Sequence, residues 1–492
     1  MLTDTDLAAR RLVIAGCLLA LLGSKLALIA SHGSPTPFWD QWDAEAAKIY
    51  RPWFAGTLRL ADLFATHNEH NLFFTRLTAL ALLIVNGRWD PILQMLVNAV
   101  FYTATVGVLV AILGRGLDRT GALLLWAFAL AVYAVPFAWE SSLLGFLQFY
   151  ILILLAPLGL YLLFDSAAFS TRWWAGNVVA LLSFLSLASG SLTPLAFVVV
   201  ALVQLGLRVR SGRRELAGIV LQIAAAAVLI WLTPTIKGHQ ELRAQSLLEW
   251  LDALVLLASW PLGSGGRLSS LAWLGAAAML APVITVAVCL LRERAPLKDP
   301  RWFYVMLAVW VGWQMLTFSY GRSRNAYYTS RYTDIYLVGV LVNAACLMRL
   351  TLVDLRDRLR VMLPLALTWL VIVFAAGGFR ALTQVQQEIA WRRDTGAIQT
   401  EAVKRYLATG DAAVLENKPQ FHIPYPTPDR LVELLSDKSI RAILPPVLLG
   451  EDDRGKVKRA VLKYGPLLIP LGLALLLGGA LAASLRESRV KD

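Results

Sequence analysis

Long apolar runs are the feature that most constrains how this chain of 492 residues can fold. Most runs approach or reach the ~20 residues that a helix needs to cross a bilayer. Only 16% of the residues are charged, against about 25% in a typical soluble domain. We therefore predict an all-α polytopic membrane protein and exclude a soluble enzyme, a disordered or fibrous chain and a disulfide scaffold. The runs cover residues 12–30, 72–86, 91–113, 121–138, 143–164, 173–189, 192–207, 216–232, 246–262, 269–291, 303–318, 332–348, 361–378 and 464–484.

Two of these runs are poor candidates for crossing a membrane. Run 72–86 contains Arg76, and run 246–262 contains Glu249 and Asp252. Burying a charged side chain in lipid is costly, so both runs fit better as helices at the interface. Without them we expect about 12 spans, within a range of roughly 11–14. We interpret the first run as a retained span and not as a cleaved signal peptide, because no small-residue cleavage site follows it.

The basic residues predict the orientation of the spans. The net charge is +13, and short loops such as 208–215 and 349–360 are rich in Lys and Arg. Basic loops of this kind remain on the cytoplasmic side, so we expect both ends of the chain in the cytoplasm. The same loops account for the positive charge, and nucleic acid is not expected as a partner.

This topology places most polar sequence on the extracytoplasmic side. We divide the chain into a transmembrane part, 1–378, whose first outer loop is 31–90, a small extracytoplasmic segment, 379–463, and a last span with a cytoplasmic tail, 464–492. The extracytoplasmic segment begins with an amphipathic helical pattern and ends near a strand-like stretch, 441–444. We therefore expect an α+β segment there.

The start of the first outer loop carries closely spaced carboxylates. Asp40 and Asp43 are three residues apart, which places them on one face of a helix, and the adjacent Trp39 and Trp42 suit headgroup depth. A carboxylate held near the membrane surface could act as a general base on a lipid-linked substrate. The alternative is an acidic amphipathic helix whose Asp side chains simply face water.

A second polar stretch follows in the same loop. His67 and His70 share one face, with Glu69 beside them. Two imidazoles and a carboxylate could bind a divalent metal, with Asp40, His67 and His70 as the alternative ligand set. They could equally bind a polar substrate such as a sugar, or merely decorate the interface. No cofactor is required by the sequence.

The loop at residues 319–332 is cationic and aromatic. Arg guanidinium groups match phosphate oxygens in a bidentate way, and Tyr rings can stack on a sugar or hydrogen-bond to it. The alternative is a solvated loop with anchoring tyrosines. The candidate phosphate ligands are Arg322, Arg324 and Arg331, and the candidate substrate ligands are Tyr327, Tyr328 and Tyr332.

Two further outer loops offer single polar candidates. Lys237 could contact a phosphate or be an ordinary solvated charge, and His239 lies two residues beyond it. Glu140 is the lone charge in a tight outer turn, where it could line the same cavity or cap a helix.

The order of these features resembles the GT-C class of membrane glycosyltransferases. Members have a first span, an outer loop with an acidic motif, a His-led juxtamembrane helix and many further spans. Here Asp40, Asp43, Glu45 and Tyr50 occupy the place of the acidic motif. His67 to His70 occupy the place where many members have His-Pro-Pro, which is a departure from the pattern. The resemblance covers mainly residues 1–115 and the overall topology.

The resemblance implies an inverting transfer of a sugar from a polyprenyl-phosphate donor to a lipid, glycan or protein acceptor. It implies a site on the outer face of a bacterial inner membrane. In this scheme Asp40 is the general base and Asp43 assists it. Lys237 and the three arginines hold the phosphate. Sugar or acceptor contacts are expected from Glu45, His67, Glu69, His70, Glu140 and His239, together with the three tyrosines.

Three rival functions stay open from the sequence. A transporter or flippase would need ionisable residues within the spans, where Lys25 is the main exception and lies close enough to the outer end to snorkel. An O-antigen-type polymerase or ligase would use an Arg-rich loop such as 319–331. A scaffold subunit without catalysis is the third.

Overall fold

The computed structural model describes residues 4–234, 236–263, 270–323, 325–327, 329–451 and 455–489. Within these ranges the regular secondary structure is helical, apart from one antiparallel hairpin of β1 (Thr66–His67) and β2 (His70–Asn71). The prediction of an all-α chain is thus confirmed for the described residues. The longer helices are α1 (Asp4–His32), α5 (Pro91–Leu113), α11 (Arg213–Trp231), α13 (Ser270–Glu293), α14 (Arg301–Gly321), α15 (Thr333–Arg349), α16 (Leu359–Arg380), α17 (Gln386–Thr409) and α21 (Leu468–Arg489). The helix α10 (Thr193–Gly206) is extended by a preceding 3-10 turn to the helical stretch Ala188–Gly206.

The apolar helices make this an integral membrane protein. Nine helices in the described ranges are long and apolar enough to cross a membrane. Three other predicted spans correspond to shorter helices, α6 (Arg119–Tyr133), α8 (Gln148–Leu163) and α9 (Thr171–Leu182). At 1.5 Å per residue, a helix of 15 residues is about 22 Å long, less than the ~30 Å of a hydrocarbon core. Twelve crossings therefore remain a prediction.

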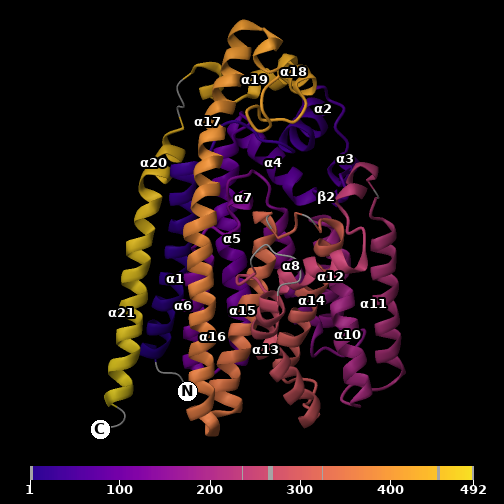
Figure 1. Ribbon diagram of the computed structural model, residues 1–492, viewed down its shortest axis with the longest axis vertical. Helices are drawn as coiled ribbons and strands as arrows, with labels where there is room; N and C mark the ends of the chain where they lie inside the picture. Colours follow the sequence, from indigo (N-terminus) through magenta and orange to yellow (C-terminus); the bar gives the residue numbers. More distant parts are fainter. Residues whose placement is uncertain are drawn as a thin grey trace.

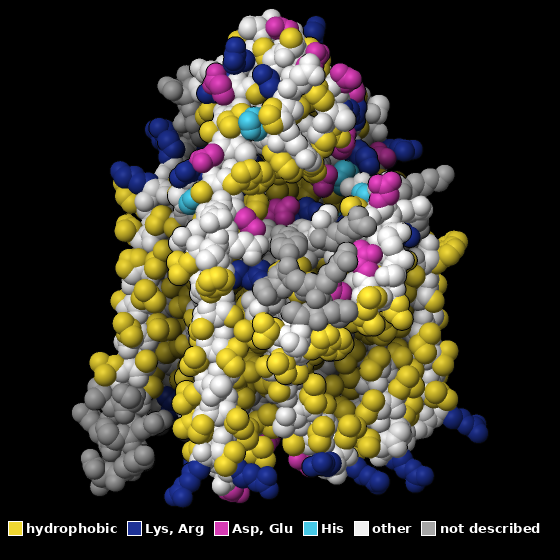
Figure 2. Space-filling view, in the orientation of Figure 1, with side chains coloured by type: hydrophobic (Ala, Val, Ile, Leu, Met, Phe, Trp, Pro, Cys, Tyr) yellow, Lys and Arg dark blue, Asp and Glu magenta, His cyan; other side chains and the backbone are white. Residues whose placement is uncertain are grey.

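The molecule has an apolar body and a polar cap. In Figure 1 the start of α1 and the end of α21 lie at the bottom, whereas α17 reaches the top. Figure 2 shows hydrophobic side chains over the lower, wider part and Lys and Arg side chains along its lowest edge. The start of α1 and the end of α21 thus lie on the same side of the body, opposite the cap, as their assignment to one compartment requires. Which compartment this is remains a prediction.

The first and last long helices pack closely because small residues face each other. A Cβ on Gly16 would meet the Gly472 carbonyl oxygen at 2.6 Å, and one on Gly472 would meet the Ala20 nitrogen at 2.5 Å. Small residues let helix backbones approach closely in a membrane. This contact places α21, more than four hundred residues later, beside α1 (Figure 1).

The cap is carried by one very long helix. Residues Arg356–Thr409 form a continuous helical stretch of 54 residues that includes α16, a π-helical segment at Ala381–Val385, and α17. The expected boundary between residues 378 and 379 therefore lies inside a helix. Beyond it, α18 (Pro428–Ser436) and α19 (Lys438–Ile443) complete the cap at the top of Figure 1.

The expected strand at 441–444 is wrong. The side chain of Asp437 accepts hydrogen bonds from the backbone of Ser439 and Ile440, which caps α19 and starts a helix at Lys438. The buried face of this helix, with Ile440 and Ile443, packs into the core of the cap. In so few residues a helix with one apolar face and a strand have similar spacing of apolar residues. The N-cap at Asp437 is the local signal that favours the helix.

The cap core combines the first outer loop with the C-terminal segment. Trp42, Ile49 and Trp89 from the loop pack with Val403 and Leu434. The helix α4 (Phe73–Asn86), which we predicted not to cross, contributes Ala79, Leu80 and Leu83 to the same core. Its Arg76 is fully buried, but its guanidinium donates to the backbone carbonyls of Asp62 and Ala65. Part of the guanidinium is thereby hydrogen-bonded within protein, while its Nη2 has no hydrogen-bond partner in the described part.

Two buried residues of opposite charge lie in the body. The Lys25 side chain is 3% exposed and its Nζ lies 4.3 Å from the centre of the Tyr102 ring, while Asp334 at the start of α15 is 1% exposed. The two charges interact electrostatically. The expectation that Lys25 snorkels to the interface is therefore wrong, because its charge is compensated inside the bundle by a residue from a distant helix.

Candidate active site

The first outer loop turns sharply just before its helix begins. Trp39 has a φ of 53°, and a π-helical segment follows at Trp42–Tyr50. Asp40 thus lies in the turn, and Asp43 lies within the helix. The two carboxylates contact different residues, and Asp40 precedes the helix that carries Asp43, so the helix through both that we expected is not observed.

Asp40 contacts the hairpin that follows α3 (Leu60–Phe64). Its Oδ1 lies 3.3 Å from Nε2 of His67, and 36% of its side chain is exposed. The hairpin pairs His67 with His70 around a two-residue turn, in which Asn68 adopts a φ of 51°, a conformation that Asn tolerates. Asn71 donates to the Phe184 carbonyl at 3.3 Å, which anchors the hairpin to the body.

The far side of the hairpin is held by residues from two later loops. An Nη2 of Arg322 lies 2.5 Å from Oε1 of Glu69, and Nδ1 of His239 lies 2.8 Å from Oε2. The same guanidinium nitrogen is 3.0 Å from His239 Nδ1. Three segments that are far apart in the sequence therefore converge on one carboxylate.

A second cation lies close to Asp40. Arg331 donates to Glu140 at 3.0 Å, from the short helix α7 (Trp139–Ser142), and its side chain remains 40% exposed. Its positive charge also acts on both Asp40 and His70. Among the described residues the guanidinium also lies 5.8 Å from the centre of the Tyr332 ring, and its exposed part can face a ligand.

The environment lowers the pKa of both Asp40 and His70. Burial raises the pKa of Asp40, but the hydrogen bond and charge of His67, with the charges of Arg331 and His70, outweigh it and lower the pKa below its ordinary value. Burial lowers the pKa of His70 to about 4, and Arg331 and Arg322 act in the same direction. At neutral pH a carboxylate therefore lies beside a neutral imidazole.

We call this assembly the junction cluster, because it lies where cap and body meet. Figure 2 shows a hollow at that level, with acidic and basic side chains inside it, and β2 and α7 lie at the same level in Figure 1. The carboxylate can accept a proton and the guanidinium groups can bind an anion. The members are Asp40, His67, Glu69, His70, Glu140, His239, Arg322 and Arg331.

Asp43 has a different set of contacts. Its carboxylate accepts a hydrogen bond from the Tyr425 hydroxyl and two from the Arg430 guanidinium, at 3.0 and 3.1 Å. Both partners belong to the C-terminal part of the cap. The contacts around Asp43 therefore attach the first outer loop to the cap.

Glu45 is fully buried, so the structure does not present it to a substrate. Its Oε2 accepts hydrogen bonds from Trp89 at 2.7 Å, Gln94 at 2.9 Å and Tyr50 at 3.1 Å. Burial raises its pKa to about 7, although these hydrogen bonds oppose the shift. The sequence motif that contains three acidic residues thus divides into one accessible, one cap-bound and one buried carboxylate.

Two tyrosines of the later loop, Tyr327 and Tyr332, are buried, and Tyr332 packs beside Arg331. Tyr327 is buried and its hydroxyl accepts a hydrogen bond from Arg380. The ring of Tyr332 stacks on Phe318, with centroids 4.3 Å apart. Neither side chain is open to a sugar in this structure. Arg324, Tyr328 and the side chain of Lys237 lie outside the described residues.

The alternative metal site is not formed. Among the described residues, no group of three or more His, Cys, Asp and Glu side chains is arranged to hold a metal ion. Asp40 and His67 are paired, but the Nδ1 of His70 is buried with no hydrogen-bond partner in the described part. The geometry therefore does not support Asp40, His67 and His70 as a ligand set.

One buried cation near the cluster was not predicted. Arg392 of α17 is 1% exposed, its guanidinium lies 4.2 Å from the centre of the Phe38 ring, and its charge interacts with Glu140. Within the described part its Nη2 has no hydrogen-bond partner. The sequence contains one signal that could have indicated this residue. Polar side chains recur at helical spacing along α17, and all of them are buried, namely Arg392, Thr395 and Gln399.

The fold and the cluster define the class of this chain as a polytopic α-helical membrane protein with an acid–cation cluster between its body and its polar cap. No protein-family model matches the sequence, and no curated protein matches it significantly. A crystal structure of the oligosaccharyltransferase of Archaeoglobus fulgidus, in complex with Zn and sulfate, is similar at 15% identity with a TM-score of 0.47. The match covers 84% of this chain and spans 57% of the length of that protein.

Proposed function

We propose that this protein is a membrane glycosyltransferase of the GT-C type. It transfers a sugar from a polyprenyl-phosphate donor to a hydroxyl group of a lipid, glycan or protein acceptor, on the extracytoplasmic face of a bacterial inner membrane. The observation that carries the proposal is the convergence of an accessible carboxylate, Asp40, with the guanidinium of Arg331 at the junction of body and cap.

The proposed chemistry is a single displacement with inversion. The acceptor oxygen forms a bond to the anomeric carbon, while the bond from that carbon to the phosphate oxygen breaks and polyprenyl phosphate leaves with the electron pair. Asp40 takes the acceptor proton, since its lowered pKa keeps it ionised at neutral pH. His67 is a positioning residue that holds the carboxylate.

The cations would stabilise the leaving phosphate. Arg331 is exposed enough to donate to it, and charge aimed at a developing anion often supplies the largest catalytic term. Glu69 and His239 hold Arg322 in place beside His70, and this side of the cluster is proposed to bind the sugar. The polyprenyl tail would remain in the lipid beside the apolar body.

The test supplies purified protein with a labelled polyprenyl-phosphate monosaccharide and a membrane extract as the source of acceptor. The expected result is acceptor-dependent release of polyprenyl phosphate, lost in Asp40→Asn and retained in Asp43→Asn. A polymerase or ligase would instead require a pyrophosphate-linked oligosaccharide, and a transporter would release neither product. Release that is unaffected by Asp40→Asn would contradict the assignment of the base.

Transport is the second candidate, and one observation favours it. Lys25 and Asp334 form a charge pair inside the bundle, and ionisable residues at such positions often belong to transport pathways. Reconstitution in vesicles would show movement of a labelled lipid-linked sugar between leaflets, abolished by Asp334→Asn. Absence of such movement in a preparation active in transfer would reject this candidate.

A further inference from the structure

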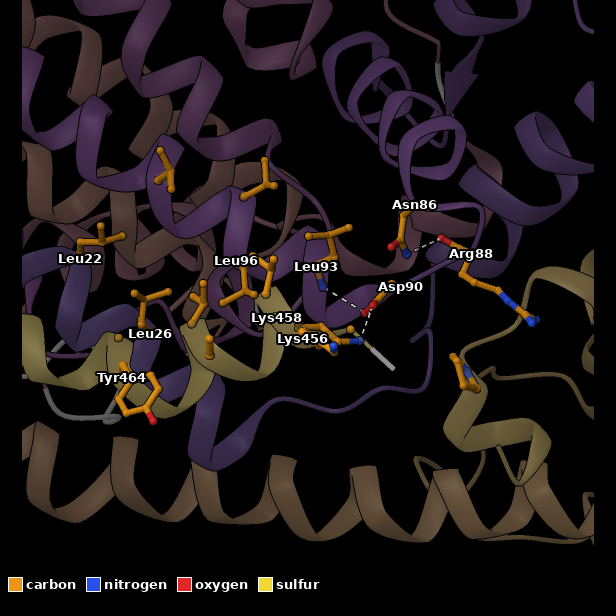
Figure 3. A pocket seen from close by; sticks show the side chains of 18 of the residues that line it. Leu22, Leu26, Asn86, Arg88, Asp90, Leu93, Leu96, Lys456, Lys458 and Tyr464 are labelled. Carbon is orange, nitrogen blue, oxygen red and sulfur yellow. Dashed lines mark hydrogen bonds and ion pairs between the residues drawn. The ribbon is translucent and has the colours of Figure 1, made fainter. Parts of the chain in front are cut away.

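A large groove opens on the side of the body where α1, α5, α20 (Lys456–Tyr464) and the start of α21 meet. Its volume is about 1660 Å³, above the roughly 300–1,000 Å³ of ordinary small-molecule sites. Figure 3 shows its lining residues, none of which belongs to the junction cluster. The groove is therefore separate from the site proposed for sugar transfer.

The wall of the groove is apolar and follows membrane helices. Leu22 and Leu26 come from α1, and Leu93, Leu96 and Val100 come from the first turns of α5. The eight positions from Leu93 to Val100 extend about 11 Å along the helix axis. Both helices are apolar enough to span the membrane, so this wall faces the region where lipid chains lie.

The rim of the groove is polar and has more basic than acidic residues. Arg88, Lys456 and Lys458 line it together with Asp90 and Glu451, which leaves one positive charge in excess. Figure 3 shows both lysines beside Asp90, at the end of the groove where α5 begins. Basic side chains at this position suit a phosphate at headgroup depth.

The rim cations differ in how firmly they are engaged. Lys458 forms an ion pair with Asp90, and Arg88 donates to the Ala442 carbonyl at 2.7 Å and lies 3.5 Å from Glu451. Lys456 is exposed at the first position of α20. Tyr464, at the last position of α20, is also exposed and lines the groove, as is typical of tyrosines at the membrane interface.

We propose that this groove binds one anionic phospholipid of the surrounding membrane. Its acyl chains lie along α1 and α5, and its phosphate is held by Lys456 with Arg88 and Lys458. The apolar wall at membrane depth favours a lipid over a soluble ligand, and the excess of positive charge on the rim favours an anionic headgroup over a zwitterionic one. This inference does not depend on the transfer reaction.

Native mass spectrometry of the full-length protein in detergent tests the proposal directly. The protein is titrated with dioleoyl phosphatidylglycerol and, separately, with dioleoyl phosphatidylcholine, which has the same chains. We expect a one-lipid adduct at about fivefold lower concentration of the anionic lipid, the preference that one basic residue near a membrane surface supplies.

Two variants separate the headgroup contact from the wall contact. Lys456→Gln should remove the preference for phosphatidylglycerol and leave binding of phosphatidylcholine unchanged. Val100→Trp, at an exposed position of the wall, should weaken binding of both lipids equally. Lys418→Gln, an exposed lysine of the cap outside the groove, is the matched control and should change neither.

Three results would overturn the proposal. One is an unchanged lipid preference in Lys456→Gln, and another is unchanged binding of both lipids to Val100→Trp. The third is displacement of phosphatidylglycerol by polyprenyl phosphate at an equal or lower concentration, which would identify the occupant as a substrate or product of transfer. None of these readouts uses enzymatic activity, so failure here is distinct from failure of the proposed function.

Discussion

The regions around Asp40 and Asp43 contrast although the two residues are three positions apart. Asp40 lies in a turn, contacts His67 and experiences the charge of Arg331, whereas Asp43 is bonded to Tyr425 and Arg430 of the cap. The difference shows that acidic residues of one short motif can have separate partners, the hairpin for Asp40 and the cap for Asp43. It also gives a matched pair of substitutions with opposite expected effects.

The largest expected difference concerns transfer activity. Asp40→Asn should lower kcat by about 10²–10⁴, because the acceptor hydroxyl loses its general base. Asp43→Asn should keep kcat within roughly threefold, because Asp43 touches the cap and not the cluster. Steady-state kinetics on both purified variants checks this. An equal decrease of kcat in the two variants would contradict the separate roles expected for Asp40 and Asp43.

Glu45, the third carboxylate of the motif, should affect the pH dependence of the free energy of unfolding. Its pKa of about 7 in the fold exceeds its ordinary value, so the folded state binds more protons than the unfolded state between pH 4.5 and 7. Its contribution is fully present below this window and is lost as pH rises through it, by at most about 3 kcal/mol. Thermal unfolding at pH 5 and pH 8 should show a smaller pH dependence for Glu45→Gln than for the wild type.

Substitutions of Arg331, whose charge acts on Asp40, and of Arg430, which binds Asp43, compare the cations of the two regions. Arg331→Ala should raise KM for the donor about tenfold or more, since a hydrogen bond to a charged group contributes about 1.5–3 kcal/mol. Arg331→Lys should restore part of this affinity, because the charge returns without the bidentate geometry. Arg430→Ala is the control and should leave KM unchanged. A raised KM in both variants would mean that the cap residue also acts on the donor.

The smallest effect is expected for the Asp43–Arg430 pair itself. Both side chains are partly exposed, so a double-mutant cycle with Asp43→Asn and Arg430→Ala should give a coupling of about 1 kcal/mol or less. Chemical denaturation at low and high salt measures it, and salt should weaken the coupling. A coupling of zero at low salt would show that this pair does not hold the cap.

The sequence predicted the juxtaposition of the first outer loop with the Arg-rich loop because both follow from topology. The number of predicted spans between the two loops places the acidic residues after the first span and the cation Arg331 on the same side of the membrane. It did not separate Asp40 from Asp43, since the helical spacing argument assumed a helix through both. In the structure the helix begins only after Asp40, which lies in the turn that starts at Trp39.

Other residues could not be assigned because their partners are distant in the sequence. Glu45 is enclosed by Trp89 and Gln94, and Lys25 is compensated by Asp334. Local patterns carry no information on such pairs, so an exposed role was expected for both Glu45 and Lys25. The α19 helix was missed for a local reason, namely that its N-cap at Asp437 outweighs a short apolar stretch.

The continuous helix from Arg356 to Thr409 has a mechanical consequence. A hydrogen-bonded rod of this kind fixes how far the cap stands from the bilayer, because no loop can absorb a change in distance. Any tilt of its lower half is transmitted to Arg392 and to the residues beneath the cap, except where the π-helical segment at Ala381–Val385 allows a bend. The thickness of the host membrane would thereby set how far the cap stands above the lipid.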